Sequence, residues 1–209
     1  MAKQNMVQWV YSSRNNQELA ERYDQWAKTY DVDLAQEFQW ESPVRAVEAF
    51  AKHVPKETRV MDAGAGTGLV GALLSDLGYR DLVAMDMSLG MLEESRNKNV
   101  YLEFHQMVMG EPLGFATDSF GATISVGVLT VGHAPVSSLD ELVRVTMPGG
   151  YIVFSLRPDL YEEGGFREKQ IALESAGSWE LVEVGDKFQP LPKGEPEVFH
   201  QVWVYRVLP

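Results

Sequence analysis

The chain has 209 residues, 45% of them hydrophobic, a formal net charge of −12 and no cysteine. This length and apolar content are typical of one globular domain with a full hydrophobic core, and the missing cysteines exclude disulfides, thiolate catalysis and Cys-ligated zinc. The excess of acidic residues and the scattered basic ones argue against a nucleic-acid partner, because phosphate recognition needs a basic surface.

Targeting segments are not visible in the sequence. Residues Met1–Met6 lack the apolar core of a secretion signal. No apolar run approaches the ~20 residues that cross a bilayer. We therefore expect a cytoplasmic protein without a membrane partner.

Residues 1–50 are predicted to form an N-terminal helical cap. A short helix or arm reaches Asn16, and the next helix covers Leu19–Tyr30. Its apolar and aromatic residues recur as on one helical face: Leu19, Tyr23, Trp26, Ala27 and Tyr30. A third helix is expected to begin at Ser42, with Pro43 in its first turn.

Strands and helices alternate through the core, residues 57–209. Apolar runs predict strands at Arg59–Asp62, Leu82–Asp86, Tyr101–Met107, Ala122–Val126 and Tyr151–Leu156. Helical patterns lie between and after them, at Gly68–Leu77, Ser88–Asn97, Ser138–Val145 and Phe166–Ala176. This alternation predicts one α/β domain, residues 1–209, with a doubly wound parallel sheet.

Two details of this pattern are more specific. Ser138 and Glu141 have the spacing of a capping box at the start of a helix. The last two strands, Trp179–Val184 and Val198–Leu208, have no helix between them. They should therefore form an antiparallel hairpin.

Three glycines at alternate positions follow the first strand, in Asp62-Ala-Gly-Ala-Gly-Thr-Gly68. Glycine permits positive φ and lets the backbone approach a ligand, and the next helix N-terminus offers free N–H groups to a negative group. The dinucleotide fingerprint requires its third glycine at position 69, which is Leu69 here. The loop therefore indicates a nucleotide-type ligand but disfavours NAD.

Two acids lie at the ends of the first two strands. Asp62 precedes the glycines, where it would repel a pyrophosphate but attract a positive group such as an amino-acid ammonium. Asp86 ends the second strand, where an acid can bind both hydroxyls of a ribose. One acid for an ammonium and one for a ribose describe S-adenosylmethionine.

The order of these motifs resembles that of the class I S-adenosylmethionine-dependent methyltransferases. Asp62–Gly68 and Asp86–Ser88 match the first two motifs of the family, and three more segments resemble its other parts: Tyr23–Asp31, Phe120–Leu129 and Glu141–Gly150. The resemblance implies a Rossmann-like, mostly parallel seven-stranded sheet with N-terminal helices that cover the cofactor. It also implies methyl transfer from S-adenosylmethionine, with S-adenosylhomocysteine as the product.

The resemblance assigns the cofactor-binding residues to the loops at one edge of the sheet and to the cap: Tyr30, Asp62, Ala63, Gly64, Gly66, Gly68, Asp86, Met87, Met109, Gly110, Glu111 and Val126. The family usually has an adenine-binding acid after the third strand, where this chain has Met109. The backbone of Met109 and Gly110, or the Glu111 side chain, must serve instead. The acid usual in the fourth strand is Gly121 here. Met87 and Tyr30 either contact the cofactor or only pack in the core.

Histidine is the natural base near neutral pH. His133 follows the fourth strand, close to the expected position of the sulfonium methyl, so we predict it as the catalytic residue on the substrate side. Its alternative role is to cap the next helix. His200 lies on the last strand and can also approach the pocket. His53, at a helix end, is expected on the surface, and His105, inside the third strand, fits a structural role. No metal is expected.

The sequence does not name the methyl acceptor. A small molecule or a protein side chain is expected, and the oligomeric state stays open. Two other functions also stay open: a non-catalytic module that binds the cofactor or a partner, and an NAD-dependent enzyme, which Asp62 and the glycine spacing disfavour.

Overall fold

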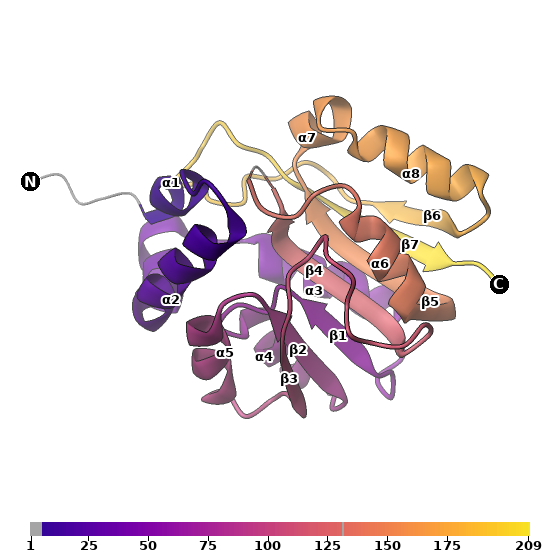
Figure 1. Cartoon of the computed structure of the whole chain (residues 1–209), viewed down its shortest axis with the longest axis horizontal. Coiled ribbons are helices and arrows are strands. Elements are labelled where there is room, and N and C mark those ends of the chain that lie inside the picture. Colours follow the sequence, from indigo (N-terminus) through magenta and orange to yellow (C-terminus); the bar gives the residue numbers. More distant parts are fainter. Residues whose placement is uncertain (1–5, 131) are drawn as a thin grey trace, which may run out of the picture.

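The computed structural model describes residues 6–130 and 132–209 and is built on one seven-stranded sheet (Figure 1). The strands are Val60–Ala63 (β1), Leu82–Asp86 (β2), Glu103–Gln106 (β3), Phe120–Leu129 (β4), Thr146–Leu156 (β5), Trp179–Val184 (β6) and Gln201–Val207 (β7). They lie in the order β3-β2-β1-β4-β5-β7-β6. β1 to β5 run parallel, and β7 is antiparallel to both β5 and β6. The predicted sheet with its C-terminal antiparallel hairpin is therefore confirmed.

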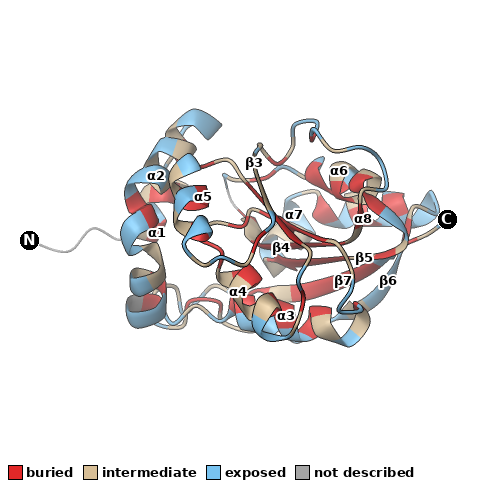
Figure 2. Cartoon of the chain, turned by 90° about the horizontal axis from the view of Figure 1, so that it is seen from below, coloured by how far each residue is buried: buried red, intermediate tan, exposed pale blue. Residues whose placement is uncertain are grey.

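Helices cover both faces of the sheet, and Figure 2 shows the buried strands between the two helix layers. The helices are Met6–Tyr11 (α1), Asn16–Val32 (α2), the π-helix Asp33–Phe38 (η1), Ser42–His53 (α3), Leu69–Asp76 (α4), Leu89–Arg96 (α5), Ser138–Val145 (α6), Pro158–Glu163 (α7) and Phe166–Ser175 (α8). α3 and α4 pack on one face through Phe50 and Leu74, and α6 and α8 pack on the other through Leu142 and Phe166. Of the helices described, none is long and apolar enough to cross a membrane.

The central strands are buried on both faces, which explains why they read as continuous apolar runs. On β1, Met61 and Ala63 belong to the core beneath α6, whereas Val60 belongs to the core beneath α3 and α4. Successive strand residues point to opposite faces, so this short strand serves both layers. A strand buried in this way holds the loop that follows it in a fixed position.

The N-terminal helices form a separate hydrophobic cluster. Val10, Leu19, Trp26 and Leu34 come from α1, α2 and η1, and Leu191 joins them from the loop before β7. This cluster corresponds to part of the predicted helical cap, residues 1–50. α3 packs on the sheet instead, and residues 1–5 lie outside the described part of the chain. The π-helix within the cap was not predicted.

Several boundaries differ from the predicted ones. α7 was not predicted, β4 and β5 are longer than expected, and β3 and β7 are shorter. The hydrogen-bond ladder decides where a strand ends, and it depends on neighbours that a local pattern does not contain.

The predicted capping box of α6 is wrong. The helix has its N-cap one residue earlier, without a side-chain hydrogen bond, and the Ser138 hydroxyl has no partner. The Glu141 carboxylate instead binds the Arg144 guanidinium at 2.7 Å and accepts from the Leu113 N–H at 2.6 Å. A charged guanidinium is a stronger partner for a carboxylate than a backbone N–H. The Ser138 N–H has its own acceptor, the Pro135 carbonyl.

Candidate functional site

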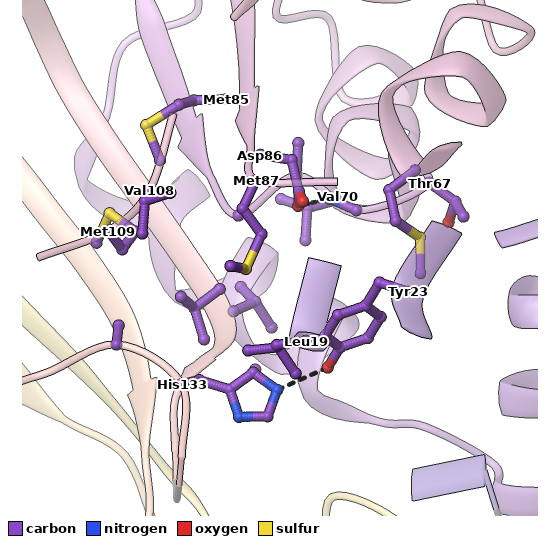
Figure 3. A pocket seen from close by; sticks show the side chains of 18 of the residues that line it. Leu19, Tyr23, Thr67, Val70, Met85, Asp86, Met87, Val108, Met109 and His133 are labelled. Carbon is purple, nitrogen blue, oxygen red and sulfur yellow. Dashed lines mark hydrogen bonds between the residues drawn. The ribbon is translucent and has the colours of Figure 1, made fainter. Parts of the chain in front are cut away.

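A cavity of about 820 Å³ lies at the carboxyl ends of β1, β2 and β4. The glycine loop after β1 and the ends of β2 and β4 line it, together with residues after β3 and on α2 (Figure 3). The strand order reverses between β1 and β4, and doubly wound sheets bind ligands at such a switch point.

The glycine loop adopts the left-handed backbone region at three positions. The φ angle is +84° at Gly64, +54° at Gly66 and +88° at Gly68, values that other residues rarely adopt. Sterics add a second requirement at Gly64, where a Cβ would lie 2.1 Å from Cγ2 of Val128 on β4. The loop therefore lies close against β4 and presents its backbone to the cavity.

Hydrogen bonds of Asp86 connect the glycine loop to the end of β2. Its Oδ2 accepts from the Gly66 N–H at 2.8 Å, and its Oδ1 accepts from the Ser88 N–H at 2.9 Å. Burial raises the pKa of Asp86, and these backbone donors oppose the rise. A carboxylate has about four lone-pair sites, so Asp86 can accept further hydrogen bonds from a ligand in the cavity that it lines.

Asp62 lies behind the glycine loop and is not part of the cavity lining. Its Oδ2 accepts from the Tyr101 hydroxyl at 2.5 Å, and that hydroxyl accepts from the Gly71 N–H of α4 at 3.1 Å. Its Oδ1 is buried and has no partner. Burial raises the pKa of Asp62 to about 7, against the effect of the Tyr101 hydrogen bond and with a contribution from the Asp86 charge. A positive group near Oδ1 would stabilise the ionised form.

Methionines make up much of the apolar lining. They come from β2, α5 and the segments after β2 and β3: Met85, Met87, Met91, Met107 and Met109. Figure 3 shows Met87 beside Asp86. Thioether side chains adapt to flat apolar groups, so this wall suits a planar ring.

The residues predicted to replace the missing adenine-binding acid lie in different places. Met109 lines the cavity. Gly110 has a φ of +97° and lies against Pro135, where a Cβ would be 2.4 Å from Cγ of the ring. Glu111 is exposed. The segment after β3 therefore presents Met109 and its neighbour Val108 to the cavity, and neither Gly110 nor Glu111.

α2 contributes Leu19, Tyr23 and Tyr30 to the cavity lining. The Tyr23 hydroxyl and Nε2 of His133 are hydrogen-bonded at 2.8 Å, as Figure 3 shows. The Tyr11 ring meets the His133 ring edge-on, with centroids 5.4 Å apart. His133 thus lies at the cavity as predicted, and not at the N-cap of α6. Burial raises the pKa of both Tyr23 and Tyr30, so their hydroxyls remain protonated near neutral pH.

Known proteins share this sequence pattern and this fold. A family model described as a methyltransferase domain matches residues 61–154. Human methyltransferase-like protein 27 is 33% identical over 165 residues, which cover 76% of this chain and 66% of that protein. The demethylmenaquinone methyltransferase of Renibacterium salmoninarum is 38% identical over 144 residues, which cover 65% of this chain and 57% of the relative. The chain belongs to the class I S-adenosylmethionine-dependent methyltransferases.

The fold of this methyltransferase agrees with that assignment. A putative methyltransferase of Haloferax volcanii, solved in complex with the Trm112 methyltransferase activator, has a TM-score of 0.68 at 18% identity. The match covers 91% of this chain and 97% of that one. By length, the methyltransferase spans between about half and two thirds of the curated relatives described above.

Two acids of α2 bind residues of the methyltransferase outside the cap. The Asp24 carboxylate accepts from the Ser88 hydroxyl at 2.5 Å and from a backbone N–H of α5 at 2.8 Å. Asp31 forms an ion pair with Lys98 at 2.6 Å and accepts from the Thr67 hydroxyl of the glycine loop. Neither acid was predicted. Their i, i+7 spacing, which places both on one face of α2, was the available signal.

The structure brings together most of the predicted site of the methyltransferase. The predicted site residues that line the cavity are Tyr30, Gly64, Gly66, Asp86, Met87, Met109, Val126 and His133. Five others lie outside the lining: Asp62, Ala63, Gly68, Gly110 and Glu111. Lining residues that the sequence did not indicate include Leu19, Trp40, Val108 and Val128. These apolar positions carry no local signal, because they reach the cavity through the packing of the cap and of β4.

Proposed function

We propose that this methyltransferase binds S-adenosylmethionine in the cavity at the glycine loop and transfers its methyl group to an acceptor, with S-adenosylhomocysteine as the product. The observation that carries the proposal is Asp86, which is bonded to the loop and lines the cavity at the end of β2. An acid in this place can accept hydrogen bonds from both hydroxyls of a ribose.

The methionine end of the cofactor is proposed to lie over the glycine loop. The loop residues that shape its site are Ala63, Gly64, Gly66 and Gly68. Asp62 is the proposed counter-charge for the ammonium, supported by its unpartnered Oδ1 and its raised pKa. Tyr30 is proposed to cover this end from α2.

The adenine is proposed to lie between apolar side chains of β2, β4 and the segment after β3. Met87, Met109 and Val126 line the cavity there, and their thioether and methyl groups suit a flat ring. Gly110 and Glu111 stay proposed for the outer edge of the ring on the strength of the sequence.

Methyl transfer from a sulfonium depends mainly on alignment. A lone pair of the acceptor attacks the methyl carbon in line with the C–S bond, and the electrons of that bond pass to sulfur. His133 is our proposed catalytic residue on the acceptor side, because it lines the cavity and is held by Tyr23. Its proposed task is to orient the acceptor.

We propose a small-molecule acceptor, with a protein side chain as the other possibility. Relatives named demethylmenaquinone methyltransferase support a small molecule. A net charge of −12 disfavours nucleic acid. The single domain over residues 1–209 and the cytoplasmic location stay predictions from the sequence.

Calorimetric titration with S-adenosylmethionine and S-adenosylhomocysteine tests the proposal. We expect Asp86→Ala to weaken both affinities roughly 10- to 1000-fold, because two hydrogen bonds to a charged group are lost. Asp76→Asn, at an exposed acid of α4, is the matched control and should bind like the wild type. Absence of binding by the wild type would contradict the proposal. Binding without turnover on any acceptor would favour the non-catalytic alternative.

A further inference from the structure

A second cavity, of about 480 Å³, adjoins the cofactor cavity beneath the cap. Four residues line both cavities: Tyr23, Tyr30, Trp40 and Gly127. Gly127 lies on β4 with a φ of +74°, and a Cβ there would be 3.0 Å from the Trp40 ring. A molecule in the second cavity would therefore lie next to a cofactor in the first.

Aromatic rings dominate the lining of the second cavity: Tyr11, Tyr23, Trp26, Tyr30 and Trp40. Trp26 and Tyr30 meet edge-to-face with centroids 4.7 Å apart, and Tyr23 stacks on Trp26 at 6.3 Å. The walls belong to α1, α2, η1, the segment between η1 and α3, and the loop before β7, with one residue of β4. Rings fixed in this way favour a flat aromatic ligand of small size.

Besides the tyrosine hydroxyls, two polar side chains belong to this lining, Glu195 and His200. His200 is only 6% exposed, and its Nδ1 has no hydrogen-bond partner. Its backbone is fixed by two hydrogen bonds to Phe188, at 2.8 and 2.9 Å. The Glu195 carboxylate accepts from the Gln8 amide at 2.6 Å. Buried polar atoms in native proteins nearly always have partners, so an unpaired nitrogen on a cavity wall indicates a ligand.

The charge state of His200 fits a hydrogen-bond acceptor. Burial lowers the pKa of His200 to about 4, with the Arg157 charge acting in the same direction and Asp159 opposing it. The ring is therefore neutral near neutral pH, and a neutral imidazole has one nitrogen that accepts. The Glu195 carboxylate also accepts. With the proton on Nε2, Nδ1 of His200 and the Glu195 carboxylate both offer an acceptor to a ligand that donates.

We propose that the second cavity binds the methyl acceptor, and that this acceptor is a small aromatic molecule whose O–H or N–H group donates a hydrogen bond to His200. This inference rests on the proposed function, since it places the acceptor beside a cofactor in the first cavity. His200 acts here as a specificity-determining residue. A weakly basic imidazole holds a proton poorly, so His200 recognises the donor group and does not carry its proton away.

Calorimetric titration of the full chain saturated with S-adenosylhomocysteine tests the inference with two probes. 4-Methylphenol can donate a hydrogen bond and toluene cannot. We expect the phenol to bind on the order of tenfold more tightly, the usual effect of one hydrogen bond. His200→Phe should abolish the difference. His105→Phe, at a half-buried histidine of β3 outside both cavities, should preserve it.

Nuclear magnetic resonance on wild-type protein with ¹⁵N-labelled histidine covers the case in which His200→Phe fails to fold. The Nδ1 signal of His200 should move on addition of 4-methylphenol and not of toluene. Equal binding of the two probes, or stronger binding of 4-methylbenzaldehyde, which accepts but cannot donate, would overturn the inference. If the wild type does not bind S-adenosylhomocysteine, the proposed function fails. If it binds and His200 does not respond, this inference alone fails.

Discussion

Asp62 is buried and Asp86 is half-buried, and their hydrogen bonds differ. Asp86 accepts two backbone N–H groups, one on each oxygen. Asp62 accepts one hydroxyl and keeps a second oxygen without a partner. Burial raises the pKa of both, and that of Asp62 reaches about 7. In the absence of ligand, the ionised form of Asp62 is therefore unfavourable in the folded protein.

Asp62→Asn should change how stability depends on pH. The pKa of Asp62 rises from 3.8 to about 7 on folding. The acid therefore stabilises the fold fully below pH 3.8, and this contribution is lost as the pH rises through about 7. We expect the free energy of unfolding of the wild type, relative to Asp62→Asn, to be larger at pH 5 than at pH 8. Urea unfolding at the two pH values measures the difference. An equal effect of the substitution at both would contradict the prediction, and Asp76→Asn is the control.

The parts of the site that the sequence indicated are those set by a local pattern. Gly64 and Gly66 lie just after β1, and Asp86 ends β2. The strand pattern and the glycine spacing therefore place all three at one edge of the sheet. Asp24 binds Ser88, and His200 lines the second cavity, through contacts with segments distant in the sequence. A local pattern does not contain such contacts, so the sequence indicated only that His200 can approach the pocket and assigned no role to Asp24.

At the scale of elements, α2 is attached to the site near its middle and at its C-terminal end. Asp24 binds the start of α5, and Asp31 binds Lys98 and Thr67. The cavity residues Leu19, Tyr23 and Tyr30 lie on the same helix. A ligand in the cavity can therefore exchange with solvent when these attachments open.

Asp24→Ala should increase local opening of the cap without increasing local opening of the sheet. The substitution removes the hydrogen bonds to Ser88 and to the N–H of Gly90. We expect faster amide hydrogen exchange in α2 and dissociation of S-adenosylhomocysteine that is several-fold faster, with little change in β1 and β4. Stopped-flow displacement measures the dissociation rate. Glu21→Ala, on the same helix but bonded only locally to Gln17, is the control, and an equal rate for the two variants would contradict the prediction.

Element boundaries were also predictable only where a local sequence pattern sets them. β2 and β6 begin and end at the predicted residues, because their apolar runs stop at charged or turn residues. The capping box of α6 was wrong because Arg144, one turn later in the helix, competes for Glu141. Spacing alone does not reveal which of two partners a carboxylate binds.

For the whole molecule, cofactor binding should raise the melting temperature. A ligand at 100 times its dissociation constant stabilises the folded state by about 2.7 kcal/mol. In a chain of this length, each kcal/mol raises the melting temperature by roughly 2–4 °C. We therefore expect S-adenosylhomocysteine to raise it by about 5–10 °C in a thermal melt, and NADH to leave it unchanged. A larger shift with NADH would contradict the assignment of the ligand.

The architecture of the whole molecule was predictable because its connections are regular. Alternating strand and helix patterns require parallel pairing, and the missing helix between the last two strands requires antiparallel pairing. The position of the cap over two adjoining cavities was not predictable in detail. It depends on the π-helix Asp33–Phe38 and on the loop before β7, whose conformations are set by packing.

The sheet order has a consequence for synthesis on the ribosome. β7 lies between β5 and β6, although β6 precedes it in the sequence (Figure 1). When β6 leaves the exit tunnel, its place in the sheet has no neighbour, and β5 still has an open edge. Both strands must wait for β7, so the sheet closes only after β7 has left the exit tunnel. Until then the apolar edge of β5 is open to other nascent chains, and chaperones would protect the polypeptide most effectively during this interval.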